Sequence, residues 1–521
     1  MAMDPTIDKT PRGSSPDSLG AVDDGDSEKD RIERLGCQRP PQLASLWQEI
    51  GFVFSITVSQ LSSEYFVSGF TILLPTIANA LDIAASSQTW PASVFSLVIA
   101  SFLLPFGRLG DIHGCYPVYI GGCAWYCVWS LIAGFSKDEV MLNICRAIQG
   151  LGPAAYLPAG LQLLGSMYRP GPRKNLISAV YGAMAPLGFF VGLFFAGVSG
   201  EFATWRWYFW IGAILVFIVT ITSCFCIPSD MDVHQGSGTK MDWLGSVSII
   251  SGLVLVVFAI TSSSHEGWTE PYILVTFLLG VAALATAFWL EGWIVAQPLL
   301  AFDVFTKKHV RPFMVGLLFA YSTLGIYLLY ASLFRMNVLG AGPMQLVAWY
   351  TPTAIVGVAL AVVGGAILHI VPPLMLLIVT GLAIIIESVL LAMAPADAGY
   401  WQWIFIPMIM STLAVDIVFT VSNVFFTSAM PARQQGLAGS IASVLLHLGM
   451  AILLGFAELV ATETAYQGLK ASYQNVFWYN LARGATCLVV FVAFVRIPRQ
   501  KSDLTADEKA QRQSEISSET R

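Results

Sequence analysis

Long apolar runs dominate this chain and limit what it can fold into. We find about fourteen runs of roughly 20 residues, the length that a helix needs to cross a hydrocarbon core about 30 Å thick. Helices are required because lipid offers no partner for an open backbone, and the runs are too long and too uniform for the alternating strands of a membrane barrel. The sequence therefore predicts an all-α membrane protein. The runs cover residues 50–75, 90–107, 117–135, 140–166, 176–198, 207–227, 243–263, 272–292, 312–334, 344–367, 371–394, 402–427, 436–461 and 475–496.

The composition agrees with a surface that faces lipid. Charged residues make up 12% of the chain, against about 25% in soluble domains. No basic face is visible, which argues against a nucleic-acid partner. Two polar segments, residues 1–46 and 499–521, are predicted to be disordered tails. The eight cysteines show no metal-ligand spacing and there is no phosphate-binding Gly-Lys loop, so we expect no metal, no other cofactor and no ATP-driven step.

The distribution of basic residues predicts the orientation of the chain. Cytoplasmic loops carry an excess of Lys and Arg. A cytoplasmic N-terminus puts most basic loop residues on that side, and an even number of spans brings the C-terminus to the same side. Both termini of this cell-membrane protein are therefore expected in the cytoplasm. The basic residues placed inside are Arg108, Arg169, Arg173, Lys174, Lys240, Lys307, Lys308, Arg311 and Arg433, and those placed outside are Lys137, Arg206, Arg335 and Lys470.

The turn after the second run has a recognisable pattern. It reads Gly-Arg-Leu-Gly-Asp-Ile-His-Gly over residues 107–114. The glycines permit a tight turn and a close approach of helices. The acid can accept amide donors at a facing helix N-terminus and so hold one conformation. We assign this conformational role to Gly107, Arg108, Gly110, Asp111 and Gly114.

Other motifs lie within the first six runs. Residues 74–78 read Leu-Pro-Thr-Ile-Ala, residues 146–152 read Arg-Ala-Ile-Gln-Gly-Leu-Gly, and a Trp-Arg-Trp segment precedes the sixth run. The fifth run contains Gly182, Pro186 and Gly188. A proline bends a helix, so Pro186 offers a point at which helices can repack.

Together these segments resemble the major facilitator superfamily. The turn is similar to the family's loop between helices 2 and 3, although Ile112, Cys115 and Tyr116 stand where basic residues are usual. The fifth run resembles the Gly- and Pro-rich helix of the family's antiporters. The span count resembles the fourteen-span drug:proton antiporters, and within them the fungal branch of aminotriazole-resistance and toxin-efflux proteins.

The resemblance implies a fold and a domain organisation. We expect the major facilitator fold, with two six-helix bundles at residues 47–227 and 312–498 and two extra spans within residues 228–311. Parallel bundles that rock around a central cavity are what this fold implies. A monomer is expected.

Charges within the predicted spans are candidates for function. Each costs about 2.5–3.5 kcal/mol at the bilayer centre and so needs a reason. Glu64 lies in the first run and Arg146 in the fourth, and in the resembled fold these helices flank one cavity. We expect an ion pair in which Glu64 takes the coupling proton and Arg146 tunes the pKa of Glu64. A purely structural pair is the alternative, and many family members have their acid two residues further along, at the place of Phe66.

Further candidates lie in the same interior. Asp416, in the middle of the twelfth run, could take a proton or bind a cationic substrate; the alternative is a structural acid with a polar partner. Gln60, Gln149 and Asn423 are candidates for polar contacts with substrate, and equally for hydrogen bonds between helices. Aromatic side chains that could stack on a planar substrate are Phe66, Tyr156, Trp349, Tyr350 and Phe425.

We predict a proton-coupled exporter of drugs, toxins or secondary metabolites, and no enzyme. Its partners would be a small-molecule substrate, protons and the lipid bilayer. Export rests on the resemblance, because the same scaffold also suits import of a nutrient, siderophore or amino acid. A membrane-embedded transferase is the alternative of another class. It would use Asp111 and His113 as an acid–histidine pair, which the turn motif explains better.

Overall fold

The computed structural model describes residues 38–83, 90–168, 172–228, 240–295, 299, 310–429 and 435–495. All regular structure in these residues is helical, which confirms the predicted class. The predicted tails lie mostly outside the described residues. The helices are α2 (Leu46–Ala80), α3 (Trp90–His113), α4 (Cys115–Ala133), α5 (Glu139–Met167), α6 (Pro172–Phe202), α7 (Arg206–Cys226), α8 (Trp243–Glu266), α9 (Pro271–Trp289), η2 (Leu290–Ile294), α11 (Val310–Ile326), η3 (Tyr327–Ala331), α12 (Ser332–Asn337), α13 (Pro343–Ile370), α14 (Pro373–Ala392), η4 (Trp401–Phe405), α15 (Ile406–Ala429), α16 (Gln435–Glu463), η6 (Ala465–Gln467) and α17 (Leu469–Phe494).

Twelve helical stretches in the described residues are long and apolar enough to cross a membrane. The long helices α2 and α5, which the sequence also predicts as spans, do not meet this criterion. Both bury polar side chains inside the protein, among them Gln60 and Glu64 on α2 and Arg146 and Gln149 on α5. A helix surrounded by other helices does not need an apolar surface all round, so its mean hydropathy is lower. The structure thus gives twelve candidate spans where the sequence predicts fourteen.

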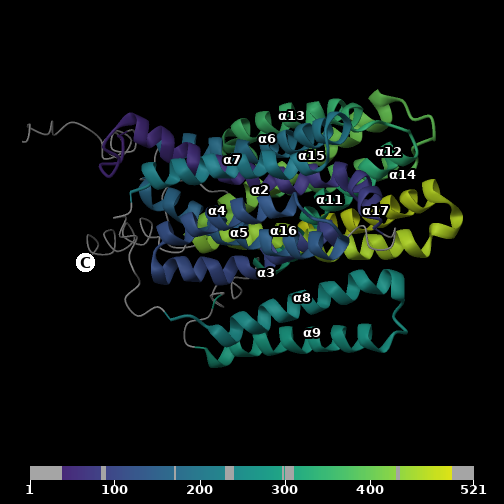
Figure 1. The fold of residues 1–521 in the computed structure, drawn as a ribbon, viewed down its shortest axis with the longest axis horizontal. Coiled ribbons are helices and arrows are strands. Elements are labelled where there is room, and N and C mark those ends of the chain that lie inside the picture. Colours follow the sequence, from purple (N-terminus) through teal and green to yellow (C-terminus); the bar gives the residue numbers. More distant parts are fainter. Residues whose placement is uncertain are drawn as a thin grey trace, which may run out of the picture.

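Helices α2 to α7 pack with one another (Figure 1). Successive helices run in opposite directions, so α2 begins at one face of the molecule, which we call the proximal face, and ends at the other, the distal face. α2 packs against α6 and α7, and α5 packs against α3 and α4. The contact between α2 and α6 is close, because a Cβ atom added to Gly192 would lie 2.4 Å from the backbone oxygen of Tyr65.

Helices α11 to α17 form a second packed group. In this group α14 packs against α15 and α17, and α16 packs against α11 and α17. The helix that opens the group is continuous from Val310 to Asn337 but contains a π-helical turn at Tyr327–Ala331. Such turns are rare in proteins overall, and those that occur often lie at functional sites.

The two groups meet along two seams. α6 packs against α13, and α3 packs against α16. The hairpin of α8 and α9 covers the second seam, because Val257 on α8 is buried together with Leu97 on α3 and Ala451 on α16. Figure 1 shows this hairpin at the edge of the molecule, outside both groups.

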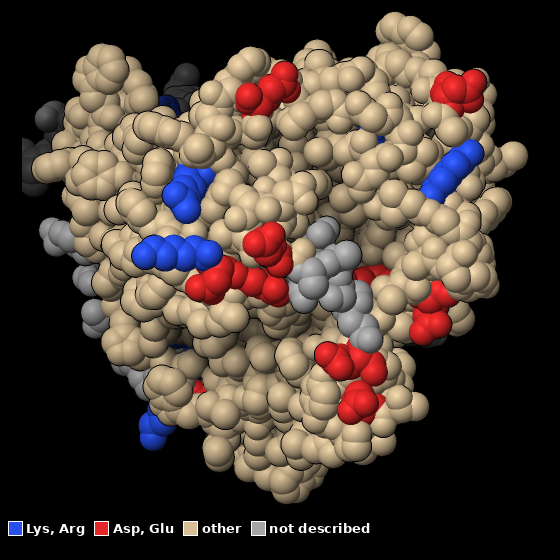
Figure 2. Space-filling view, turned by 45° about the vertical axis from the view of Figure 1, so that its right-hand side comes forward, with Lys and Arg blue, Asp and Glu red and all other residues tan. Residues whose placement is uncertain are grey.

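The outer surface is apolar. Leu278 and Leu279 on α9 are each 57% exposed, and Phe225 on α7 is 80% exposed. The face seen in Figure 2 is mostly covered by uncharged residues, with Lys, Arg, Asp and Glu widely scattered. Soluble monomers rarely expose large contiguous apolar patches. Lipid is therefore the medium that suits this surface.

Candidate functional site

Glu64 lies in the interior of the first group of helices. Its side chain projects from the middle of α2 and is 6% exposed. Gln60, one turn earlier, donates a hydrogen bond from Nε2 to Glu64 Oε1 over 3.3 Å. The Tyr181 hydroxyl on α6 donates to Gln60 Oε1 over 2.9 Å. Gln60 therefore links α2 to α6 and orients the carboxylate of Glu64, so the structure brings these two predicted residues together.

Asp416 lies on α15, in the second group, beside the seam between α6 and α13. A Cβ atom added to Gly357 on α13 would lie 3.0 Å from Asp416 Oδ2 and 2.4 Å from Cβ of Pro186 on α6. Only a glycine at 357 leaves room for this approach. Asp416 Oδ2 is buried and has no hydrogen-bond partner among the described residues.

The two acids, one from each group, lie within electrostatic reach of each other. Two carboxylates in a low-dielectric interior repel each other, and one proton bound between them relieves that repulsion. Uptake or loss of a proton at Glu64 or Asp416 would therefore change the force between the two groups of helices. The sequence predicts each acid as a candidate but does not predict that they lie within electrostatic reach of each other.

Arg146 does not contact Glu64 in the described part of the chain. It donates hydrogen bonds from Nε to the Pro91 carbonyl over 3.3 Å, from Nη1 to Gln149 Oε1 over 3.0 Å, and from Nη2 to the Phe66 carbonyl over 3.2 Å. Its guanidinium carbon lies 4.3 Å from the ring centroids of both Phe70 and Phe95. The expected ion pair is thus absent, because carbonyl oxygens and aromatic faces stabilise this buried cation in place of a carboxylate.

Replacing Arg146 with lysine should destabilise the protein while leaving the pH dependence of transport in place. Lysine keeps the charge but cannot reach three acceptors in the fixed geometry of a guanidinium. We expect a loss of about 1–3 kcal/mol of stability, seen as a lower thermal unfolding midpoint in detergent. Arg206→Lys, at an exposed site, is the control. An altered pH dependence at unchanged stability would instead assign Arg146 to proton transfer.

The two remaining polar candidates have contacts within their own groups. Gln149 is fully buried and donates from Nε2 to Ser130 Oγ over 2.7 Å, which joins α5 to α4. Asn423 donates from Nδ2 to the Phe419 carbonyl one turn earlier on α15. Gln149 therefore acts between helices, as the sequence allowed. Asn423 lies two turns from Asp416 on the same helix.

The turn motif joins α3 to α4 at the proximal face. Asp111 Oδ1 accepts a hydrogen bond from Gln162 Nε2 on α5 over 3.0 Å. The amide donor to Asp111 is thus a side chain from the first group of helices, whereas we expected the N-terminus of a facing helix. Gly114 adopts a φ of +91° directly before α4, which L side chains rarely adopt. A Cβ atom on Gly107 would lie 3.7 Å from Ser440 Oγ on α16, so this end of α3 approaches the second group. Gly110 is buried on the last turn of α3, and Arg108 is partly buried on the same turn.

The motif on α6 separates into residues with different surroundings. A Cβ atom on Gly188 would lie 2.4 Å from the backbone oxygen of Leu61 on α2, whereas one on Gly182 would meet nothing within 4 Å. Pro186, between them, faces Gly357 across the seam. One residue of the motif therefore packs α6 onto α2, one faces the second group, and Gly182 is not needed for packing.

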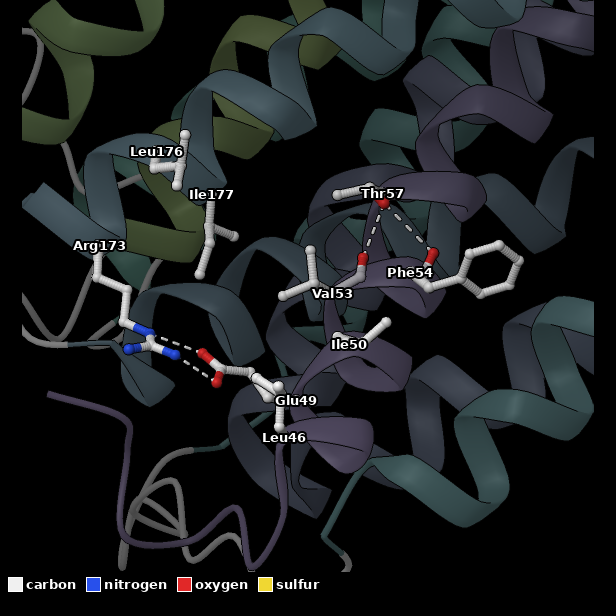
Figure 3. Close-up of a pocket in the computed structure, with 9 residues that line it drawn as sticks. All are labelled: Leu46, Glu49, Ile50, Val53, Phe54, Thr57, Arg173, Leu176 and Ile177. Carbon is white, nitrogen blue, oxygen red and sulfur yellow. Dashed lines mark hydrogen bonds and ion pairs between the residues drawn. The ribbon is translucent and has the colours of Figure 1, made fainter. Parts of the chain in front are cut away.

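A groove of about 610 Å³ lies between the proximal ends of α2 and α6 (Figure 3). Arg173 Nη2 forms an ion pair with Glu49 Oε2 over 2.5 Å, and Tyr168 donates to Glu49 Oε1 over 3.1 Å. The other lining residues are Leu46, Ile50, Val53, Phe54, Thr57, Leu176 and Ile177. The ion pair ties the start of α2 to the start of α6.

Sequence reasoning placed Arg335 in an outer loop, but the structure buries it. Its exposed fraction is 1%, on the last turn of α12. Nη2 donates to the Tyr327 hydroxyl over 2.7 Å, and the guanidinium carbon lies 4.9 Å from the ring centroid of Tyr350 on α13. The apolar run ends at 334, which hid this residue. A signal was present in Tyr327, which precedes Arg335 by two helical turns and so shares its helix face.

Known proteins resemble this chain over most of its length. The family profile described as Major Facilitator Superfamily matches residues 56–454. The low affinity ammonium transporter of Saccharomyces cerevisiae is 32% identical, covering 88% of this chain and 89% of that protein. The aminotriazole resistance protein of the same yeast is 30% identical, covering 89% of this chain and 88% of that protein. The solved structure of the peptide transporter POT is similar with a TM-score of 0.59 at 13% identity, covering 88% of this chain and 97% of that structure.

These similarities extend beyond the motifs. The motifs reach only the first six runs, whereas the family match continues into α16. The likeness to the aminotriazole resistance protein confirms the predicted resemblance to the fungal branch. This chain is a multi-pass membrane transporter that belongs to the major facilitator superfamily.

Proposed function

We propose that this protein is a proton-coupled secondary transporter that exports small organic compounds across the plasma membrane. The observation that supports it most is that Glu64, which is buried, and Asp416, which is partly buried, lie within electrostatic reach of each other from opposite groups of helices. An antiporter needs a site where proton and substrate compete, and these two acids would supply one. Gln60 and Tyr181 orient the first of them.

Proton binding at this site would act on the contact between the two groups. With one acid neutral, α2 and α15 can approach; with both charged, they repel or bind a cationic substrate between them. The α6–α13 seam at Pro186 and Gly357 is the natural pivot, because proline removes a helical hydrogen bond there and glycine offers a smooth surface. Arg146 is a positioning residue in this scheme, since it holds the Phe66 carbonyl two residues beyond Glu64.

The membrane arrangement follows from the same proposal. We infer that α2 and α5 also span the bilayer, which makes fourteen spans, with the proximal face and both termini in the cytoplasm. A helix of 35 residues such as α2 is about 52 Å long, more than enough to cross. We further propose that the transporter acts as a monomer.

Import is the second candidate function, because one relative is named for ammonium transport. Another relative is named for aminotriazole resistance, which favours export. Expression in two yeast strains separates the two directions. An exporter should lower the accumulation of 3-aminotriazole in a strain that lacks its own efflux pumps, and an uncoupler should abolish the effect. An importer should restore growth on low ammonium to a strain that lacks ammonium uptake. Aminotriazole accumulation that does not respond to the uncoupler would contradict proton coupling.

Replacing Asp416 with asparagine should abolish uncoupler-sensitive export or change which compounds are exported. Asparagine keeps the volume of the side chain but can neither bind the proton nor neutralise a cation. Asp397→Asn, at an exposed site before α15, is the matched control and should export normally. Membrane expression of both variants is compared with that of the wild type. Unchanged export by Asp416→Asn at equal expression would remove Asp416 from the mechanism.

A further inference from the structure

Arg335 differs from Arg146, another buried arginine, in how its donors are satisfied. Arg146 has an acceptor for each of its three nitrogens. Arg335 donates from Nη2 to the Tyr327 hydroxyl and also interacts with the Tyr350 hydroxyl, while its Nε and Nη1 have no hydrogen-bond partner among the described residues. A buried donor without an acceptor is costly, and charged donors most of all. The N–H groups of Arg146 are thus all used within the protein, whereas Arg335 has N–H groups that a ligand could use.

Aromatic rings surround this guanidinium. Its central carbon lies 5.2 Å from the ring centroid of Tyr327 and 4.9 Å from that of Tyr350. The Tyr350 hydroxyl is hydrogen-bonded to Ser332 Oγ over 2.9 Å, which fixes the ring. Ring faces attract a cation and also offer a stacking surface to a planar group. Arg335, Tyr327 and Tyr350 together form what we call the distal arginine site.

The site lies next to the seam between the two groups. Tyr350 contacts Phe189 on α6, with ring centroids 6.1 Å apart. Further toward the distal face, Glu201 Oε2 on α6 accepts a hydrogen bond from the Met344 N–H at the start of α13 over 3.0 Å. These contacts close the seam over the site in this conformation. Separation of α6 from α13 at the distal face would uncover Tyr350 first and Arg335 behind it.

No carboxylate in the described residues neutralises Arg335 by direct contact. Glu387 on α14 is fully buried and lies within electrostatic reach of both Arg335 and Arg483, yet it forms no ion pair within 4 Å with either. Glu387 therefore leaves the N–H groups of Arg335 unoccupied.

We propose that the distal arginine site binds the anionic group of a transported compound. The compounds it would take are aromatic or planar carboxylates. The free N–H groups of Arg335 would donate charge-assisted hydrogen bonds to the carboxylate. Tyr327 and Tyr350 would pack against its ring. This assignment rests on the proposed transport function and adds a substrate class to it.

Binding of benzoate and of its neutral analogue benzamide to the purified full-length protein tests the assignment. Benzoate should raise the thermal unfolding midpoint in detergent in a concentration-dependent manner, and benzamide should have a much smaller effect. Arg335→Gln should weaken benzoate binding at least about tenfold, and Arg335→Lys should weaken it less. Arg206→Gln, at an exposed arginine, should bind benzoate like the wild type.

Glu387→Gln tests whether this acid belongs to the binding site. Glu387 forms no ion pair with Arg335, so the variant should bind benzoate like the wild type. The proposal is overturned if benzamide stabilises as well as benzoate does, if neither stabilises, or if Arg335→Gln retains the effect. Should Arg335→Gln fail to fold, Arg335→Lys and the comparison of benzoate with benzamide still decide. Benzoate binding with uncoupler-insensitive transport would sink the proposed proton coupling and leave this site standing.

Discussion

Replacing Glu64 with glutamine should remove the dependence of transport on a pH gradient. In vesicles with an imposed gradient, one exchanged proton supplies about 1.4 kcal/mol per pH unit, enough for a roughly tenfold substrate gradient. Glutamine is isosteric and keeps an oxygen for the hydrogen bond from Gln60, so the fold should be retained. It cannot take up or release a proton. We therefore expect the accumulation ratio of 3-aminotriazole to fall from about tenfold per pH unit toward equality.

The matched control is Glu463→Gln, at an exposed acid on the last turn of α16. It should accumulate substrate like the wild type. Counterflow without a gradient separates loss of coupling from loss of transport. Glu64→Gln should still exchange labelled for unlabelled substrate across the vesicle membrane. A variant that keeps full gradient-driven accumulation would exclude Glu64 as the coupling group and leave Asp416 as the candidate.

Replacing Gly188 with valine should destabilise the first group of helices. Its Cβ atom would lie 2.4 Å from the oxygen and 2.7 Å from the Cα atom of Leu61, both in the backbone of α2. Backbone atoms cannot move aside as a flexible side chain can, so α2 and α6 would have to separate. We expect a loss of about 1–3 kcal/mol, and more if the helices cannot adjust. The measurement is the thermal unfolding midpoint of the purified protein.

Gly182→Ala on the same helix is the control. Nothing lies within 4 Å of a Cβ atom there, and alanine favours a helix by about 1 kcal/mol over glycine. This variant should be as stable as the wild type or more so. Equal destabilisation by Gly182→Ala and Gly188→Val would mean that α6 bends more, or packs differently, than the structure indicates.

The motif residues show how far a local pattern can predict a site. Gly114 was assigned from its place in a turn, and it has the positive φ that a tight turn uses, since turn geometry is set by neighbours in the chain. Gly182 and Gly188 look alike in sequence, yet only Gly188 meets another helix. The difference depends on which side of α6 each glycine occupies, because only one side packs against α2. No local pattern contains this information.

The buried arginines make the same point for charge. Hydropathy placed Arg146 inside a span and Arg335 outside one, because a run of apolar residues continues past the first and stops before the second. Both are buried, at 1% exposure. The partner expected for Arg146 was the acid on a neighbouring helix, but two phenyl rings and three oxygens occupy its surroundings. Sequence reveals that a charge must be stabilised but not by which groups.

The sequence by itself determined the helical class, the position of most spans and the family, because a bilayer leaves an apolar helix few alternatives and the motifs are local. Only the tertiary structure decided that Glu64 and Asp416 lie within electrostatic reach of each other, that Gly357 makes room for Pro186, and that two nitrogens of Arg335 lack acceptors among the described residues. These facts depend on how helices far apart in the chain cross. Crossing geometry is set by side-chain packing over many residues at once, which hydropathy does not record.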